Sequence, residues 1–214
     1  MGSEMCIRDR LGRRWISPGY VNLLFSVLLR PNILPDRVFS LTMIAAIACA
    51  DAIRTLSGLH AKIKWPNDIY VERRKLGGIL TEFKASVERV DYVVVGLGIN
   101  VNWSPEDRDE VLYPATSILA ETGRYSSRQD LLVQILKDLE TDYKILMRGD
   151  VESFYKRWNE LCCIRDRVVQ VDMGEKELKG RVLRIDRDGA LVIRKQGGEQ
   201  ERVLWGDVSV QWEV

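Results

Sequence analysis

The chain has 214 residues, 46% of them hydrophobic, which is enough to bury the core of one large domain or of a medium domain and a small one. Its 32 basic and 31 acidic residues leave a formal net charge of +1, so no overall field favours nucleic acid or an anionic membrane as a partner. The most apolar stretch, residues 41–50, is interrupted by Thr42 and falls short of the ~20 residues that a membrane span needs, and no signal peptide is visible, so we expect a cytoplasmic protein.

The first residues do not resemble the start of a folded element. Residues 1–9 are polar and mixed in charge, and the sequence from Cys6 to Arg10 recurs identically at residues 163–167. We therefore expect residues 1–9 to be a non-native leader, with the native chain beginning further upstream. From Arg10 a basic loop leads to the apolar run 21–29, which is bounded by prolines and predicts a buried strand.

A helix and then several strands are expected next. Apolar residues three or four apart between Pro35 and Gly58 predict an amphipathic helix that Gly58 ends. Short apolar runs then predict strands at residues 61–65, 69–71, 76–84 and 92–100, the second and third joined by a turn at residues 72–75. Residues 103–116 are polar and acidic, and a loop of that length is expected to have a function, such as a lid over a site.

Two more helices precede a change of pattern near Cys163. Ser126, with Gln129 three residues later, resembles a capping box that opens a helix running to Gly149, and a shorter helix covers residues 151–161. Short strands separated by glycine-bearing turns then predict a small β-barrel, with strands at residues 168–171, 177–185, 190–194, 202–205 and 208–211. The chain is therefore expected to be α+β, with one domain over residues 10–162 and a barrel domain over residues 163–214.

The chain lacks the usual signatures of metal and nucleophilic catalysis. Its four cysteines have no C-x-x-C spacing and only one histidine, His60, accompanies them, so we expect reduced cysteines and no metal site. We find no nucleophile with a base and no paired carboxylates at catalytic spacing. The remaining chemistry is positioning and charge stabilisation, as in nucleotidyl or phosphoryl transfer. Mg²⁺ in such a reaction would arrive with ATP.

One stretch concentrates the candidate site residues. Lys64 ends an apolar strand that Trp65-Pro66 stops abruptly, so its ammonium group could be partly desolvated and hold a phosphate or carboxylate. The alternative is a lysine in water at the end of a strand. Gly77 and Gly78 open another strand, where glycine is favoured if a ligand approaches the backbone, or alternatively if the strand bulges.

Two further groups resemble binding elements. Gly96, Gly98 and Asn100 close the most apolar strand, where a flat ligand could lie on the backbone and the amide could bind it, although a bulged strand end would need the same residues. Arg10 and Arg13 lie on a glycine-containing loop, and arginines on such a loop suit phosphate. A basic loop is otherwise solvated surface.

Taken together, three motifs resemble those of the biotin protein ligases. They are Lys64-Trp65-Pro66-Asn67-Asp68, the run from Arg74 to Glu82 that contains Lys75-Leu76-Gly77-Gly78, and Gly96-Leu97-Gly98-Ile99-Asn100. The resemblance extends from about Arg10 through the terminal barrel. It implies a mixed-sheet catalytic domain of the class II synthetase and lipoate-ligase type, followed by a small barrel. It also implies that biotin and MgATP form biotinyl-5′-AMP, from which a lysine of a biotin carboxyl carrier protein takes the biotin.

The resemblance also implies roles for individual residues. Lys64 would lie between the biotin carboxylate and the α-phosphate. Arg10 and Arg13 match the second half of the family's glycine-arginine loop, with Trp15 at its tryptophan, and this loop would close over biotin and the adenylate. Gly77 and Gly78 would line the biotin pocket. Gly96 and Gly98 would let the ligand approach the strand, and Asn100 would contact the adenine or its phosphate side, in a site that needs no protein-bound metal.

Some parts of the family pattern do not match. The family's Ser-Thr-Asn biotin contact and its Asp-x-Gln-Thr lead into the arginine loop have no counterpart, and residues 1–9 occupy their place. We therefore expect an N-terminally truncated ligase that binds biotin poorly and forms the adenylate slowly. A lipoate or octanoate ligase-like enzyme and a non-catalytic carrier-binding fragment remain alternatives. The acceptor protein and a homodimer through the sheet are left open.

Overall fold

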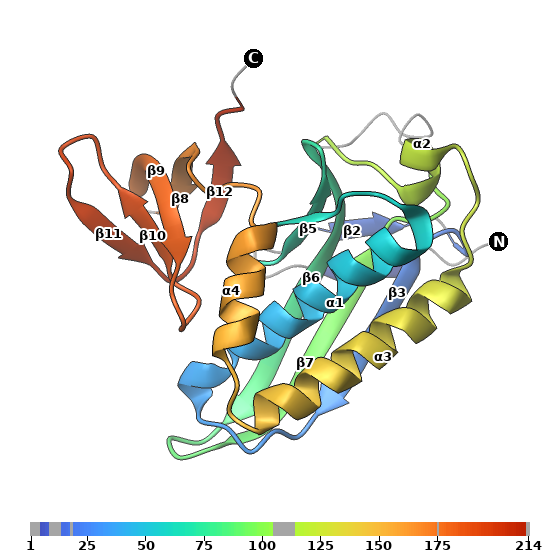
Figure 1. The fold of residues 1–214 in the computed structure, drawn as a ribbon, viewed down its shortest axis with the longest axis horizontal. Helices are drawn as coiled ribbons and strands as arrows, with labels where there is room; N and C mark the ends of the chain where they lie inside the picture. The colour runs from blue at the N-terminus through green and yellow to red at the C-terminus, as the bar shows by residue number, and fades with distance from the viewer. Residues whose placement is uncertain (1–4, 9–13, 18, 105–113, 175, 213–214) are drawn as a thin grey trace.

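The computed structural model describes residues 5–8, 14–17, 19–104, 114–174 and 176–212. Its larger part is a five-stranded sheet in the order β3-β7-β6-β5-β4, with helices on one face (Figure 1). Its strands are β3 (Leu23–Leu29), β4 (Lys62–Lys64), β5 (Asp68–Val71), β6 (Arg74–Ala85) and β7 (Val90–Ile99). The predicted α+β class is confirmed. Neighbouring strands of this sheet run antiparallel. Parallel pairing among the described residues is confined to two isolated bridges, Ile63 with Cys162 and Lys75 with Ala115.

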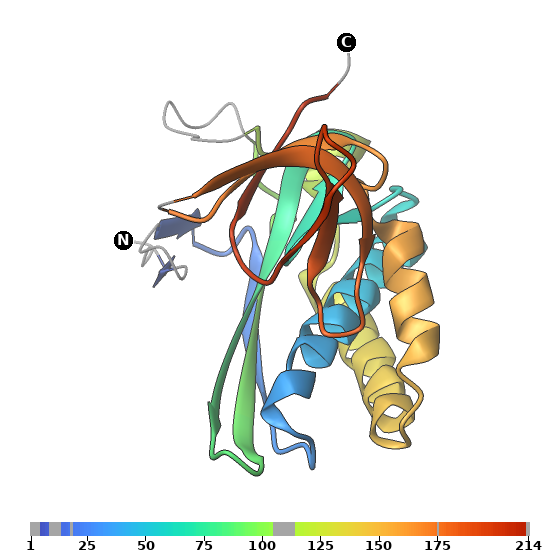
Figure 2. The ribbon, with the colours of Figure 1, turned by 90° about the vertical axis from the view of Figure 1, so that its left-hand side faces the viewer.

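Three helices form a layer over this sheet. The 3-10 turn η1 (Pro35–Arg37) leads into α1 (Phe39–Ser57), which ends where Gly58 adopts a left-handed φ of 74° and donates its N–H to Arg54. Helices α3 (Arg128–Met147) and α4 (Glu152–Leu161) pack on α1 (Figures 1 and 2). By length and hydropathy, the segment Pro35–Ser57 is apolar enough to cross a membrane, but 78% of its apolar window is buried inside the fold. Here it serves as the core helix.

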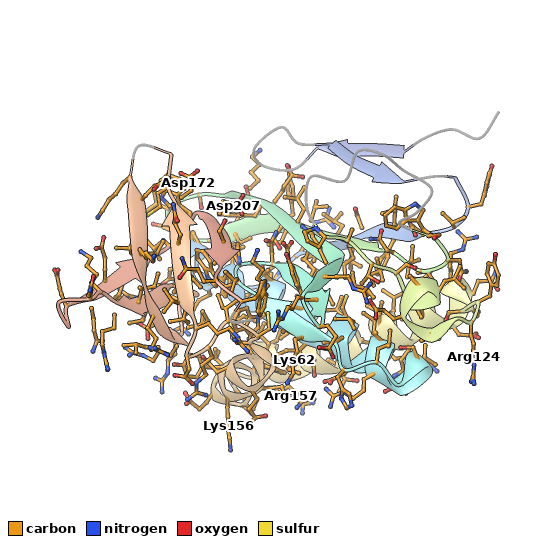
Figure 3. The ribbon with its side chains drawn as sticks, turned by 90° about the horizontal axis from the view of Figure 1, so that it is seen from above. Lys62, Arg124, Lys156, Arg157, Asp172 and Asp207 are labelled. Atoms are coloured by element: carbon orange, nitrogen blue, oxygen red, sulfur yellow. The ribbon has the colours of Figure 1, made fainter. Side chains whose placement is uncertain are left out.

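The opposite face of the sheet is the more open one. The hydroxyl groups of Thr42 in α1 and Thr81 in β6 bond to each other at 2.8 Å, which marks the covered face. The antiparallel pair β1 (Met5–Arg8) and β2 (Arg14–Ser17) lies on the other side of the sheet from the helices (Figures 2 and 3). The sequence predicts no strand in either segment, because it indicates a non-native leader at residues 1–9 and a basic loop from Arg10.

The C-terminal part is a second five-stranded antiparallel sheet in the order β11-β10-β9-β8-β12. Its strands are β8 (Val168–Asp172), β9 (Glu177–Ile185), β10 (Leu191–Arg194), β11 (Gln200–Val203) and β12 (Asp207–Val210). Every second residue of β9 from Leu178 to Val182 is buried, the pattern of a strand that covers a core on one face. All five predicted strands are present, and each begins and ends within two residues of its predicted bounds.

Three sets of hydrogen bonds, or joints, connect this sheet to the larger part of the chain. The Trp65 indole donates to the carbonyl of Gly189, at 2.8 Å, in the turn between β9 and β10. The backbone N–H of Cys163 donates to Ile63 in β4, at 2.9 Å. Asn159 in α4 pairs with both backbone groups of Ile185, at 3.0 and 3.3 Å. The bonds of Trp65 and Asn159 are buried, so the C-terminal sheet is docked by directional bonds as well as by apolar contact.

Four details differ from the sequence-based expectation. Strand β3 lies at an edge of its sheet and only its first residue is fully buried, so it is not a buried strand. The cap of α3 is Ser127, whose hydroxyl accepts from the N–H of Asp130, so the capping box at Ser126 was wrong by one residue. Strand β6 already begins at Arg74, which shortens the expected turn. The short helix α2 (Ile118–Thr122), capped by Ser117, was not predicted.

Candidate active site

Three of the predicted site residues, Lys64, Gly78 and Gly98, lie in one row across the sheet. Lys64 pairs with Asp68, Asp68 with Gly78, Gly78 with Gly98, and Gly98 with Leu24. Thr81, three residues after Gly78, faces α1, and residues an odd number apart in a strand point to opposite faces. The row therefore lies on the open face. A lysine, a carboxylate and a flat strip of glycine backbone are adjacent there.

Lys64 is buried, with 9% of its surface exposed. Burial lowers the pKa of its ammonium group, while the negative charges of Asp68 and Asp207 act in the opposite direction. Its Nζ donates to the hydroxyl of Tyr70 at 3.4 Å and lies 5.2 Å from the centre of that ring. The desolvated lysine expected from the sequence is confirmed. A cation held in this environment interacts strongly with an anionic ligand, since little water screens it.

Part of this environment comes from the barrel. Asp207 opens β12, where it pairs with Asp172 of β8, and Figure 3 marks both residues. Cys163 also acts electrostatically on Lys64, and its own pKa is raised to about 12, mainly by burial. Neither residue is a site candidate in the sequence, because nothing local links residues 163 or 207 to Lys64. Their proximity is a consequence of barrel docking.

The neighbours of Lys64 in the motif have structural roles. Trp65, 1% exposed, makes the joint to Gly189. Asn67 clamps β6: its carbonyl accepts from the N–H of Ile79 at 2.9 Å, and its side-chain amide donates to the carbonyl of the same residue. Asp68 forms an ion pair with Lys75 at 2.6 Å. The motif therefore places its lysine and fixes the strand that carries Gly78.

The two neighbouring glycines are required for different reasons. A Cβ added to Gly77 would lie 2.7 Å from the carbonyl oxygen of Gly98, so the adjacent strand alone demands glycine there. A Cβ added to Gly78 would lie 3.3 Å from a carboxylate oxygen of Asp68 and 3.7 Å from Nζ of Lys75, in the open row. Gly96 has only ordinary contacts, the shortest 3.5 Å to Ser26. Gly78 is thus the glycine best placed beside a ligand, and the binding roles of all four glycines stay predictions.

Asn100 lies at the end of β7 and is buried. Its side-chain amide donates to the carbonyl of Thr116 at 2.9 Å, and its backbone bonds to Leu76 and Ile118. These contacts tie the segment after residue 113 to the sheet. The contact of Asn100 with adenine stays a prediction. Its hydrogen bonds show that Asn100 also has a structural role.

Most of the predicted arginine loop lies outside the residues that the structure describes. Arg10 and Arg13 are not among the described residues, nor are residues 105–113 of the expected lid. Trp15 is described only through its backbone, which pairs with Ile7 in the hairpin on the open side of the sheet. Within the described ranges, Cys49, Cys162 and Cys163 are free, and no group of three or more His, Cys, Asp or Glu residues could hold a metal ion.

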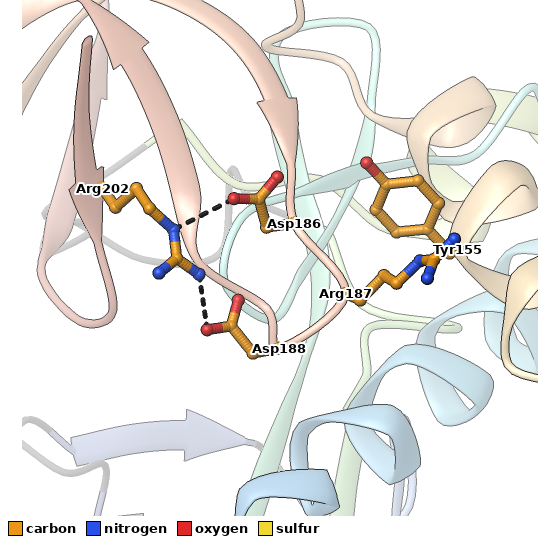
Figure 4. Close-up of a pocket in the computed structure, with 5 residues that line it drawn as sticks. All are labelled: Tyr155, Asp186, Arg187, Asp188 and Arg202. Carbon is orange, nitrogen blue, oxygen red and sulfur yellow. Dashed lines mark hydrogen bonds and ion pairs between the residues drawn. The ribbon is translucent and has the colours of Figure 1, made fainter.

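A hollow of ≈ 360 Å³ lies elsewhere, between α4 and the β9-β10 turn (Figure 4). Its charges are already compensated, because Arg202 bonds to Asp186 at 3.0 Å and to Asp188 at 2.6 Å, and Arg187 pairs with Glu152. Tyr155 completes the lining. The hollow contains neither Lys64 nor a glycine of the row, so we give it no part in the reaction.

Comparison with protein families gives two matches. Residues 8–100 match the Biotin/lipoate A/B protein ligase family, and residues 166–211 match the Biotin protein ligase C terminal domain. The bifunctional ligase/repressor BirA of Escherichia coli is 30% identical over 190 residues, which are 89% of this chain and 59% of that protein. The chain therefore spans less than two thirds of this relative.

Two further relatives are covered more fully. Biotin–[acetyl-CoA-carboxylase] ligase of Paracoccus denitrificans is 28% identical over 90% of this chain and 82% of its own length. The structure of the biotin protein ligase from Aquifex aeolicus in complex with biotin and ATP superposes with a TM-score of 0.81 at 26% identity, covering 96% of this chain and 84% of that one. Both the sheet and the barrel have counterparts in these comparisons.

Proposed function

Because the chain belongs to the biotin protein ligase family, we propose that it joins biotin to a lysine of a biotin carboxyl carrier protein, using ATP and passing through biotinyl-5′-AMP. The observation that carries the proposal is the row on the open face: buried Lys64 beside Asp68, followed by the bare backbone of Gly78 and Gly98. A solved relative with the same fold holds biotin and ATP.

In the first step, a biotin carboxylate oxygen attacks the α-phosphorus of ATP. The bond from this phosphorus to the bridging oxygen breaks, and pyrophosphate leaves with the electron pair. Lys64 stabilises the charge that accumulates between carboxylate and phosphate, and it does so from a preorganised, desolvated position. Because the positive charge is fixed before the reaction begins, little reorganisation is required.

In the second step, the neutral amine of the acceptor lysine attacks the acyl carbon of the adenylate. An amide forms, AMP leaves, and the amine loses its proton. The flat glycine strip leaves room for the planar acyl phosphate next to the strands. Mg²⁺ in this reaction would arrive bound to the phosphates of ATP and would neutralise part of their charge.

The test is direct. Purified chain is incubated with biotin, α-labelled ATP and Mg²⁺, and biotinyl-AMP is separated; a biotin-acceptor domain is then added and its labelling is measured. Lys64→Ala should lose at least 100-fold in adenylate formation, a loss of about 3 kcal/mol of transition-state stabilisation. Lys62→Ala, an exposed lysine on the same strand, is the matched control.

Other outcomes distinguish the alternatives. If the chain adenylates lipoate in preference to biotin, its substrate is lipoate and the proposed substrate is wrong. Binding of the acceptor domain without any adenylate, in wild type and Lys64→Ala alike, would leave only a carrier-binding module. A homodimer and a cytoplasmic location stay proposals, the first open to sedimentation analysis.

A further inference from the structure

We propose that Lys75 is a second phosphate-binding cation of this site, which holds the phosphate chain of the nucleoside triphosphate beside Lys64. The inference rests on the proposed function and adds a residue to it. No role for Lys75 follows from the sequence, because Lys75 lies three residues before Gly78 and, in a regular strand, would point to the opposite face.

A bulge turns Lys75 to the open face. In the ladder between β5 and β6, Asp68 pairs with Gly78 and Ile69 with Gly77, but Tyr70 pairs with Lys75, so the register shifts and Leu76 is extra. Asp68 and Tyr70 are two residues apart and share a face, hence their partners Gly78 and Lys75 share it too. Bulges re-aim side chains in this way and are common beside active sites.

The ammonium group lies at the predicted ligand surface. Its Nζ is 2.6 Å from Oδ1 of Asp68, and its Cε and Nζ are 3.6 and 3.7 Å from the position that a Cβ of Gly78 would occupy. The Lys75 side chain is 28% exposed, so it is accessible from solvent and yet held over the glycine strip. A phosphate placed on this strip would contact it.

Asp68 compensates two cations at once. It forms an ion pair with Lys75. Its negative charge is also the largest influence that raises the pKa of the Lys64 ammonium group, whereas the positive charge of Lys75 lowers that pKa. Two ammonium groups therefore flank one carboxylate. A polyphosphate carries several charged oxygens, so it can contact both ammonium groups and replace Asp68 as the partner of Lys75.

The backbone of Lys75 is fixed on both sides. Its N–H donates to the carbonyl of Pro114 at 2.8 Å, and its carbonyl accepts from the N–H of Thr116 at 2.9 Å. Only the side chain has to reorient when an anion arrives, which keeps the entropic cost of binding low. The segment that follows residue 113 is thereby attached to the same residue that would bind phosphate.

Calorimetry with ATP, with inorganic pyrophosphate and with biotin, each added separately to the full chain, tests the proposal. For Lys75→Met we expect affinity for ATP and pyrophosphate to fall about 10-fold or more, the effect of losing one charge-assisted contact, with biotin affinity unchanged within about twofold. Lys75→Arg should restore most of the affinity. Lys84→Met, an exposed lysine further along β6, is the matched control.

The results separate this proposal from the proposed function. Weaker pyrophosphate binding by Lys75→Met supports it even if the wild type forms no biotinyl-AMP. An unchanged ATP and pyrophosphate affinity in a folded Lys75→Met overturns it, even if the wild type is an active ligase. Failure of the wild type to bind either phosphate compound also overturns it. If Lys75→Met does not fold, Lys75→Gln and the Arg variant provide the same comparison.

Discussion

The indole N–H of Trp65 donates a 2.8 Å hydrogen bond to the carbonyl of Gly189, and so joins the residue after Lys64 to the turn between two barrel strands. Trp65→Phe keeps most of the apolar volume and removes this buried donor. We expect the free energy of unfolding to fall by about 1–3 kcal/mol, because the carbonyl is left without its partner in a buried place. Urea unfolding measures it. Trp205→Phe, at an exposed tryptophan, should change stability by less than about 0.5 kcal/mol, and an equal loss there would contradict the assignment.

Gly189 itself allows a second test of the same joint. It adopts a φ of 88°, and a methyl group at this position would overlap the ring of Phe39. Gly189→Ala should therefore cost about 3 kcal/mol or more, from left-handed strain and from the clash together. Gly198 has nearly the same φ, 87°, with nothing within 4 Å, so Gly198→Ala isolates the strain, about 1–2 kcal/mol. Equal losses for the two variants would show that Phe39 can move away freely.

The adjacent glycines Gly77 and Gly78 should separate folding from binding. Gly77→Ala places a carbon against the carbonyl of Gly98, and we expect a loss of about 2–3 kcal/mol in stability. Gly78→Ala meets the Asp68–Lys75 pair at longer range, so the melting temperature should change little while affinity for biotin and ATP falls about 10-fold. Thermal unfolding and calorimetry on both variants decide. Normal ligand binding by Gly78→Ala would remove this residue from the site.

Asp142, in α3, should make stability depend on pH. Burial, together with the charges of Asp138 and Asp51, raises its pKa to about 6. Since the folded state binds this proton more tightly than the unfolded chain, stability is greatest below the usual value of about 4 and falls as the pH rises through about 6. Asp142→Asn should add about 1 kcal/mol at pH 7.5, an amount reduced by the partial exposure of the carboxyl, and almost nothing at pH 4. A stabilisation independent of pH would contradict this cause.

Lys64 should set the alkaline limit of adenylate formation. Because burial lowers the pKa of its ammonium group, the rate should fall at a lower pH than for an ordinary lysine. Asp68→Asn removes the largest influence that raises this pKa, so the alkaline limb should move to still lower pH. The pH profile of kcat/KM measures both. An Asp68→Asn profile moved to higher pH would show that Asp68 does not act on Lys64 through its charge.

Much of the fold follows from local pattern. Helix α1 shows a period of three to four residues and a glycine where it ends, and the barrel strand β9 alternates buried and exposed residues, so both were predicted from sequence. The pair β1-β2 and the short helix α2 have too little pattern to be recognised. Ser126 and Ser127 are equivalent by composition, and only the backbone geometry selects Ser127 as the cap.

The candidate site was predictable as a set of residues but not as an arrangement. Lys64 and the glycines stood out because an apolar core has no use for them. The difference between Gly77 and Gly78 depends on how closely β7 approaches, and the orientation of Lys75 depends on a bulge. The influence of Asp207 on Lys64 comes from a part of the chain more than a hundred residues away. These features depend on the tertiary structure, and the spacing of residues in the sequence does not reveal them.

The two hydrogen bonds between Asn67 and Ile79 also determine how the residues of the cross-sheet row are aligned. Each strand contributes one residue to the row, from Lys64 to Leu24, so a slip of β6 by a single residue would turn Gly78 towards α1 and present its neighbour instead. Asn67 grips both backbone groups of the residue next to Gly78 and thereby sets the alignment. A substitution there would disrupt the proposed ligand surface while leaving every one of its residues in place in the sequence.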